Sequence, residues 1–308
     1  METNYNHLKQ QTARLSVISN TLLVSLKLVV GLFTGAVSIV SEAAHSAVDL
    51  IAALVAYVAV RKASKPPDSQ HAYGHGKIEN LSAAFEAVLI VVAALWIVYE
   101  SIDRINNPHM PEYLEYGLIV MAVSIVVNYW VSSKLYYVAR LTGSQALEAD
   151  ALHLKADIWT SAGVFVGLAI IKLTGLYWLD PIIAIAVAVI VFKAGFSMTM
   201  KSIYELTDVT LPEAEEAEIR AIVHQHPEVI AFHRLRTRRS GSFRLIDMHI
   251  VLKKDMYLEQ AHNVCDEIEI TIKAQFAPCD VVIHLEPCDY NEGFGFCPSE
   301  CGENCKHE

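Results

Sequence analysis

The first two-thirds of this 308-residue chain contain little charge and no cysteine. Only 19% of all residues are charged, below the roughly 25% of an average soluble domain. The mean hydropathy is +0.33. Such a composition excludes a disordered chain, a collagen-like chain and a single soluble domain.

The sparse charge is divided unevenly along the chain. Residues 1–205 hold 15 Asp and Glu against 14 Lys and Arg, a net charge of −1, whereas residues 206–308 hold 19 against 10, a net charge of −9. An acidic domain repels phosphate, which argues against nucleic acid as a partner and in favour of cationic ligands. The sequence therefore predicts a nearly neutral apolar region followed by an acidic domain.

Six apolar stretches each approach the roughly 20 residues that a helix needs to cross a membrane. They cover residues 14–35, 38–60, 80–102, 114–138, 146–172 and 177–200. A soluble helical bundle is the alternative, but so little charge would leave its helices without a polar face for water. We therefore expect six transmembrane helices surrounded by membrane lipid.

Positive charges gather on one set of the connecting segments. The short connectors 35–38, 103–113 and 173–177 contain one cation, Arg104, whereas the opposite connectors contain several. Because cytoplasmic connectors carry the excess of Lys and Arg, the second set is expected in the cytoplasm. Six crossings then place both termini and the acidic domain there, where cysteines stay reduced.

Two of the apolar stretches carry the same polar pattern, His-x-x-x-Asp. One copy is His45 with Asp49, and the other is His153 with Asp157. Residues four apart share one face of a helix, and two such faces offer the two nitrogens and two carboxylates of a tetrahedral Zn²⁺ site. A histidine that merely bonds to a neighbouring helix is the alternative, but the repetition favours a metal site. Glu42, Glu86 and Asp150 are candidates either for the path to this site or for supporting its ligands from behind.

These motifs resemble those of the cation diffusion facilitators, most closely the YiiP-like (ferrous-iron efflux) subgroup of bacterial zinc exporters. The resemblance spans residues 10–290, and includes the stretch from Asp68 to Lys77 and the sequence His284-Leu-Glu286-Pro. It implies a homodimer in the bacterial inner membrane that exports divalent metal ions from the cytoplasm in exchange for protons. It also implies a transport site made of His45, Asp49, His153 and Asp157.

One departure from the subgroup bears on the choice of metal. The first ligand of the second helix is usually Asp in this subgroup, whereas His45 stands there in this chain. Imidazole is softer than carboxylate and favours Zn²⁺ or Cd²⁺ over Fe²⁺ or Mn²⁺. We therefore expect export of Zn²⁺ or Cd²⁺. The alternatives are the same exchanger with Fe²⁺ or Mn²⁺ as its main cargo, and a membrane metal sensor that transports nothing.

An enzyme is not expected. An intramembrane metalloenzyme would keep an open coordination position on its metal and a general base beside it. Four protein ligands leave no open position. No catalytic cofactor is therefore predicted, and Zn²⁺ is expected as cargo and as a structural or regulatory ion.

The connector after the second apolar stretch contains another candidate site. The resemblance implies that Asp68, His71 and His75 bind metal here, and a solvated loop without metal is the alternative. The resemblance also implies an ion pair between Lys77 and Asp208, which would join the membrane helices to the cytoplasmic domain.

The acidic region has an αββαβ pattern. Hydrophobic periodicity and turn residues predict helix 213–225, strands 229–238 and 242–252, helix 258–275 and strand 279–286. The resemblance implies a small metallochaperone-like α/β fold that dimerises. The expected domains are a six-span α-helical transmembrane domain at 1–207, this cytoplasmic domain at 208–290 and a cysteine-rich tail at 291–308.

Metal ligands are also predicted in the cytoplasmic domain and in the tail. For the domain, the resemblance implies His233, His249, His262, His284 and Glu286, with ordinary hydrogen-bonded histidines as the alternative. The tail has thiols at a spacing used in zinc loops, with a disordered tail as the alternative. Its candidate ligands are Cys288, Cys297, Cys301, Cys305 and His307.

Overall fold

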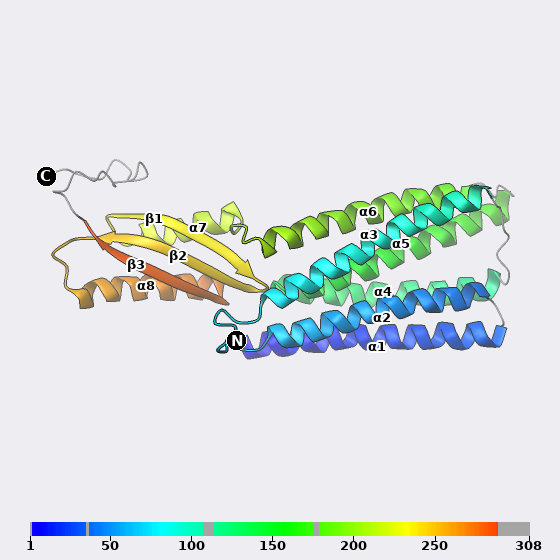
Figure 1. Cartoon of the computed structure of the whole chain (residues 1–308), viewed down its shortest axis with the longest axis horizontal. Coiled ribbons are helices and arrows are strands. Elements are labelled where there is room, and N and C mark those ends of the chain that lie inside the picture. The colour runs from blue at the N-terminus through cyan, green and yellow to red at the C-terminus, as the bar shows by residue number, and fades with distance from the viewer. Residues whose placement is uncertain (1, 35–36, 107–113, 175–178, 289–308) are drawn as a thin grey trace. The chain divides into compact units, whose positions relative to one another are not determined.

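The structure, a computed structural model, describes residues 2–34, 37–106, 114–174 and 179–288. Some side chains within these ranges, including that of His45, are not described. The chain divides into two compact units, Met1–Leu206 and Thr207–Glu308. Long helices make up the first unit, and a small sheet with helices makes up the second (Figure 1).

The described part of the first unit contains six long helices, as the six apolar stretches predict. Each has between 27 and 33 residues, which at 1.5 Å per residue exceeds the roughly 30 Å of a bilayer core. The helices are α1 (Glu2–Thr34), α2 (Val37–Ala63), α3 (Lys77–Asn106), α4 (Leu114–Thr142), α5 (Gln145–Thr174) and α6 (Leu179–Leu206).

Four of these helices are apolar enough to cross a membrane, judged on their described residues. The spans are Tyr5–Val30, Lys77–Asp103, Ile119–Thr142 and Pro181–Leu206. Helices α2 and α5, which carry the two His-x-x-x-Asp motifs, are not among the four, so their crossing stays a prediction. The first unit is a helical membrane domain.

Helix α5 holds a central position in this unit, because it packs against each of the other five helices. Small side chains permit the close approach. Ala83 and Ala87 of α3 lie in one buried cluster with Ala149 of α5 and Met198 of α6. Polar side chains on α5 can therefore meet groups from several helices.

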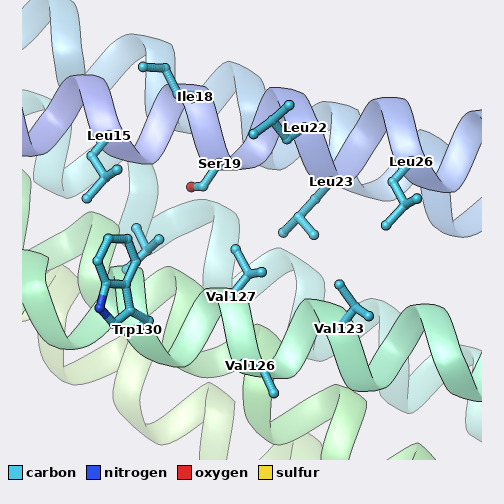
Figure 2. A pocket seen from close by; sticks show the side chains of 11 residues that line it. Leu15, Ile18, Ser19, Leu22, Leu23, Leu26, Val123, Val126, Val127 and Trp130 are labelled. Carbon is cyan, nitrogen blue, oxygen red and sulfur yellow. The ribbon is translucent and has the colours of Figure 1, made fainter.

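An open apolar groove of about 480 Å³ lies between α1 and α4 (Figure 2). Leu22 and Val126, which line it, are 65% and 68% exposed, as expected of a surface that lipid tails cover. Apart from Ser19, the groove has apolar side chains. It therefore offers no set of ligands for a metal ion.

The second unit follows the predicted αββαβ order, and every element lies within two residues of its predicted bounds. Strand β2 (Phe243–Leu252) is central, antiparallel to β1 (Ala231–Ser240) and parallel to β3 (Cys279–Pro287). Gly241, with a φ of 61°, lies in the hairpin turn between β1 and β2, where glycine adopts this backbone without strain. The elements are α7 (Glu213–His224), β1 (Ala231–Ser240), β2 (Phe243–Leu252), α8 (Leu258–Phe276) and β3 (Cys279–Pro287).

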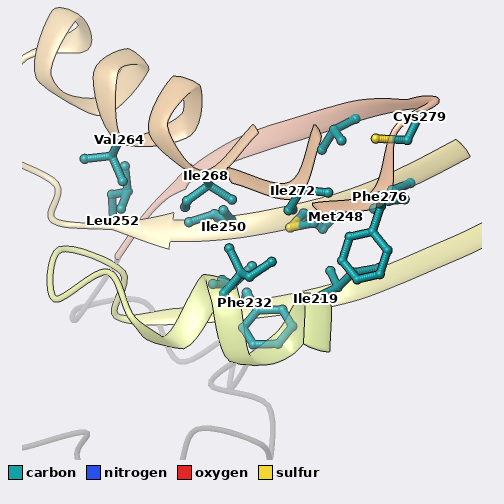
Figure 3. Packing of buried hydrophobic residues seen from close by; sticks show 14 of the residues in the cluster. Ile219, Phe232, Met248, Ile250, Leu252, Val264, Ile268, Ile272, Phe276 and Cys279 are labelled. Carbon is teal, nitrogen blue, oxygen red and sulfur yellow. The ribbon is translucent and has the colours of Figure 1, made fainter. Parts of the chain in front are cut away.

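The core of this unit lies between one face of the sheet and the two helices. Met248 and Ile250 of β2 are buried against Ile268 and Ile272 of α8 (Figure 3). Helix α7 contributes Ile219 to the same cluster. Because side chains alternate along a strand, the residues between these core positions of β2 lie on the opposite face of the sheet.

Candidate metal-binding sites

Three ligand-type side chains converge inside the membrane unit. Asp49 of α2 and His153 and Asp157 of α5 offer ligand atoms that all lie within 4.8 Å of one another. Asp49 Oδ1 lies 3.1 Å from His153 Nε2. The two side chains are 7% and 8% exposed. Asp49 of α2 thus faces the two motif residues of α5.

The fourth predicted ligand, His45, lies one helical turn before Asp49 in α2. Its side chain is outside the described residues, so its role stays a prediction. The three described ligands alone combine two carboxylates with one imidazole. With a neutral imidazole, these groups balance the charge of one divalent cation, which matters because an unpaired charge is costly in a buried site.

A second cluster lies on the connector between α2 and α3. Ligand atoms of Asp68, His71 and His75 all lie within 4.8 Å of one another there. Asp68 Oδ1 is 3.2 Å from His71 Nδ1, and Asp68 Oδ2 is 3.3 Å from His75 Nε2. Backbone N–H groups of His71 and Gln70 also donate hydrogen bonds to Asp68 Oδ1, at 2.8 and 2.9 Å. These bonds hold the pKa of Asp68 below its usual value and keep an ionised carboxylate between the two imidazoles.

A third cluster lies on the sheet of the second unit. His249 of β2 is the register partner of His233 in β1 and of His284 in β3. The three imidazoles therefore form a row across the sheet, with ring centroids 5.2 and 4.6 Å apart. A register shift in β1 directly follows His233, and such irregularities re-aim side chains near sites.

Glu286 completes this third cluster. Its Oε1 lies 2.7 Å from His249 Nδ1, in a hydrogen bond that lowers the pKa of Glu286. Its Oε2 lies 3.1 Å from His233 Nε2, in a close pair without hydrogen-bond geometry. Ligand atoms of His233, His249 and Glu286 all lie within 4.8 Å of one another, while His284 Nε2 is 3.9 Å from Glu286 Oε1.

His262 is not part of this cluster. It belongs to α8, its side chain is 69% exposed, and its Nε2 lies 3.5 Å from Asp266 Oδ2. Among the described ligand groups that converge within 4.8 Å, His262 is not included. Its predicted role in metal binding stays a prediction.

The tail ligands and the predicted ion pair also stay predictions. Cys288 is a free cysteine whose backbone N–H donates to Leu252 O. Lys77 Nζ donates to Leu206 O at 3.3 Å, while Asp208 Oδ1 lies 3.2 Å from Arg238 Nη1. Lys77 and Asp208 belong to different units. The tail ligands outside the described residues are Cys297, Cys301, Cys305 and His307.

Two cysteines, one in α8 and one in β3, are buried inside the second unit. Cys265 and Cys279 are both buried. Burial raises the pKa of Cys265 to about 11, and it also raises the pKa of Cys279. Because thiolate is the form that binds metal, these two residues are packing groups at neutral pH.

The sequence reasoning missed a buried ion pair. Lys9 Nζ of α1 lies 2.9 Å from Glu79 Oε1 of α3, and the two side chains are 4% and 1% exposed. Ser144 Oγ donates to the other Glu79 oxygen at 2.5 Å. The pair is 70 residues apart in the chain, so no local spacing could have indicated it.

Comparisons with known proteins agree with this architecture. Residues 13–207 match the family described as cation efflux transmembrane domain, and residues 211–288 match the cation efflux protein cytoplasmic domain. An uncharacterized transporter of Synechocystis sp. is 34% identical over 278 residues, which are 90% of each chain. The cation-efflux pump FieF of Cronobacter sakazakii is 32% identical over 288 residues, 94% of this chain and 96% of that one.

A solved structure is also similar to part of this chain. The metal-bound C-terminal domain of the CzcD transporter from Thermotoga maritima has 28% sequence identity and a TM-score of 0.25, over 27% of this chain and 100% of that chain. The two family matches together cover most of both units. The chain therefore belongs to the cation efflux, or cation diffusion facilitator, family and is an integral membrane cation efflux transporter.

Proposed function

We propose that this transporter exports Zn²⁺ or Cd²⁺ from the cytoplasm in exchange for protons. The transport site consists of His45, Asp49, His153 and Asp157. The observation that carries the proposal is that ligand atoms of the buried Asp49 and His153 and of the half-buried Asp157 all lie within 4.8 Å of one another. Such a set is costly in a membrane domain unless it holds a cation.

The ligand chemistry supports a borderline metal. Two imidazoles and two carboxylates suit tetrahedral Zn²⁺. Imidazole favours Zn²⁺ and Cd²⁺ over the harder Mn²⁺ and Fe²⁺. Export of Fe²⁺ or Mn²⁺ by the same site is the second candidate, since selectivity in the cell also depends on metal supply.

Protons supply the driving force in this proposal. The ligands must lose protons to bind the metal, and histidine has an ordinary pKa of about 6.5, close to working pH. When the site opens to the outside, protons compete for the imidazoles and carboxylates and release the ion. A nucleotide-driven pump is not supported, because the sequence has no G-x-x-x-x-G-K-[ST] motif.

The other clusters have regulatory roles in this proposal. Asp68, His71 and His75 bind metal at the connector, and His233, His249, His284 and Glu286 bind Zn²⁺ in the cytoplasmic domain. Metal there tightens a homodimer and biases the transport cycle. Both termini face the cytoplasm of a bacterial inner membrane, and Lys77 pairs with Asp208.

The test is metal flux in proteoliposomes that contain a metal dye and a proton dye. Zn²⁺, Cd²⁺, Fe²⁺ and Mn²⁺ are compared for wild type and for Asp157→Ala. The proposal expects Zn²⁺ or Cd²⁺ flux with opposing proton flux, both lost in the variant. Flux of Fe²⁺ or Mn²⁺ alone would favour the second candidate. Binding without any flux would favour a metal sensor.

A further inference from the structure

Two buried carboxyl groups lie near His153 but outside the proposed transport site. Glu86 of α3 is 0% exposed, and Asp150 of α5 is 1% exposed. Asp150 precedes His153 by three residues, so the two share one face of α5. Isolated charges at such positions are costly. The two acids therefore need compensation or a function.

Helix packing directs Glu86 toward α5. Ala83, which lies three residues before Glu86 and on the same face of α3, packs in one buried cluster with Ala149 of α5. The charges that act on Glu86 are those of Asp150 and His153. The interface between α3 and α5 thus brings two like-charged groups together beside the transport site.

Each of the two carboxyl groups has one oxygen without a hydrogen-bond partner among the described residues. Ser82 Oγ donates to Glu86 Oε1 over a long 3.4 Å, and the hydroxyl of Ser16 in α1 is close enough to Asp150 to favour its ionised form. Glu86 Oε2 and Asp150 Oδ2 are buried, and neither has a hydrogen-bond partner among the described residues. Buried oxygens of this kind normally have a partner.

A third acid on α3 provides a contrast. Glu79, seven residues before Glu86 and on the same face of the helix, is neutralised by Lys9 at 2.9 Å. Within the described part of the chain, no Lys or Arg acts in the same way on Glu86 or Asp150. Glu79 thus has a lysine as its partner, whereas the group that attracts the charge of the other two acids is the imidazole of His153, which is itself a proposed ligand of the transport site.

We propose that Glu86 and Asp150, with the hydroxyls of Ser82 and Ser16, form a second binding station for the divalent cation on its way to His153. This inference rests on the proposed function. In the proposed orientation, Asp150 lies on the cytoplasmic side of His153, because α5 begins at Gln145 on that side. Oxygen ligands without imidazole hold Zn²⁺ or Cd²⁺ less tightly than a set with histidine, so the ion passes on to the transport site.

The test compares flux and metal binding in the full-length protein. Zn²⁺ and Cd²⁺ flux into proteoliposomes is measured against metal concentration for wild type, Glu86→Gln, Asp150→Asn and the double variant. The double variant should raise the half-saturating metal concentration by about tenfold or more, since it removes two charged ligands. Flux at saturating metal should change little. Glu100→Gln, at an exposed site of the same helix, is the control and should match wild type.

Infrared difference spectra recorded on addition of Cd²⁺ give an independent measurement. If the two acids had a purely structural role, their carboxylate bands would not change when the metal is added. Wild type should show a metal-induced change in carboxylate bands that decreases in Glu86→Gln and in Asp150→Asn. Glu86→Asp, which keeps the carboxylate, should retain both the band change and flux. This conservative variant also tests the station if the double variant folds poorly.

The outcomes separate this inference from the proposed function. Absence of metal flux in wild type would overturn the proposed function. Flux in wild type with an unchanged half-saturating concentration and unchanged carboxylate bands in the double variant would overturn only the station. A protonated carboxyl band that the variants remove, with metal-induced bands intact, would show that the two acids carry a proton and would also overturn the station.

Discussion

Asp49 Oδ1 of α2 lies 3.1 Å from His153 Nε2 of α5, across 104 residues of sequence. Both groups are buried. A proton between them and a metal ion bound to both are alternative occupants of the same place, because a ligand must lose its proton before it binds metal. This contact is where the proposed exchange of metal for protons would take place.

Asp49→Asn should abolish most transport. The amide keeps the size of the side chain but removes the negative charge, so we expect the metal affinity of the transport site to fall by about tenfold or more. Flux of Zn²⁺ and Cd²⁺ into proteoliposomes measures the effect. Asp103→Asn, at an exposed site of α3, is the matched control. Wild-type flux in Asp49→Asn would contradict the assignment of this residue.

His45→Asp should change the order of metals. The substitution replaces an imidazole by a carboxylate, and harder ligands favour Mn²⁺ and Fe²⁺ relative to Zn²⁺ and Cd²⁺. The measurement is the ratio of Cd²⁺ to Mn²⁺ flux under one set of conditions, which should fall by about tenfold. A ratio equal to that of wild type would show that His45 does not set selectivity.

Lys9→Met should destabilise the membrane unit. The substitution leaves Glu79 buried without its cation, and removal of one partner of a buried pair costs about 3–5 kcal/mol. Thermal unfolding of the detergent-purified chain, followed by tryptophan fluorescence, should show a lower midpoint. The double variant Lys9→Met with Glu79→Gln should recover much of the loss, because no buried charge then remains.

The control for this pair is Lys62→Met, at an exposed site of α2. Surface substitutions of this kind change the free energy of unfolding by about 0.5 kcal/mol or less. If Lys9→Met unfolded at the same temperature as Lys62→Met, the pair would have no net role in stability.

Glu215 should make the cytoplasmic unit sensitive to acid. Burial raises the pKa of Glu215, but a hydrogen bond from Arg244 at 2.7 Å and the charge of Arg239 outweigh it, and the pKa lies below its usual value. A carboxyl group with a lowered pKa stabilises the folded state above its unfolded pKa of about 4.3 and loses that contribution as pH falls through the folded value.

The measurement for Glu215 is denaturant unfolding of the full chain from about pH 6 down to about pH 3. Wild type should lose stability over the acidic part of this range, and Glu215→Gln should show a shallower loss. Glu213→Gln, at an exposed position of the same helix, serves as the control and should follow wild type. Identical pH profiles for all three proteins would contradict the prediction.

Local patterns predicted most of the fold. The apolar stretches match six long helices, and the second unit follows the predicted αββαβ order. Such patterns succeed because a helix or a strand repeats its faces at a fixed period. Helices α2 and α5 are not among the candidate membrane spans found in the described residues, so their crossing stays a prediction.

The ion pair of Lys9 with Glu79 and the unpaired oxygens of Glu86 and Asp150 were beyond any such pattern. Each depends on which face of one helix meets which face of another. Packing of many side chains at once decides those contacts, and the spacing within either helix is compatible with many partners.

The sequence by itself determined the membrane character of the first unit, the αββαβ order of the second, and the ligand pairs that lie four residues apart. Only the tertiary structure decided that Asp49 meets His153, that three imidazoles lie in a row across the sheet, and that Glu79 has a lysine as its partner whereas Glu86 keeps a buried oxygen without a hydrogen bond. The physical reason is how far apart the contacting residues lie in the sequence. Residues within one helix or strand are neighbours by geometry, while groups far apart in the chain become neighbours only when whole elements pack.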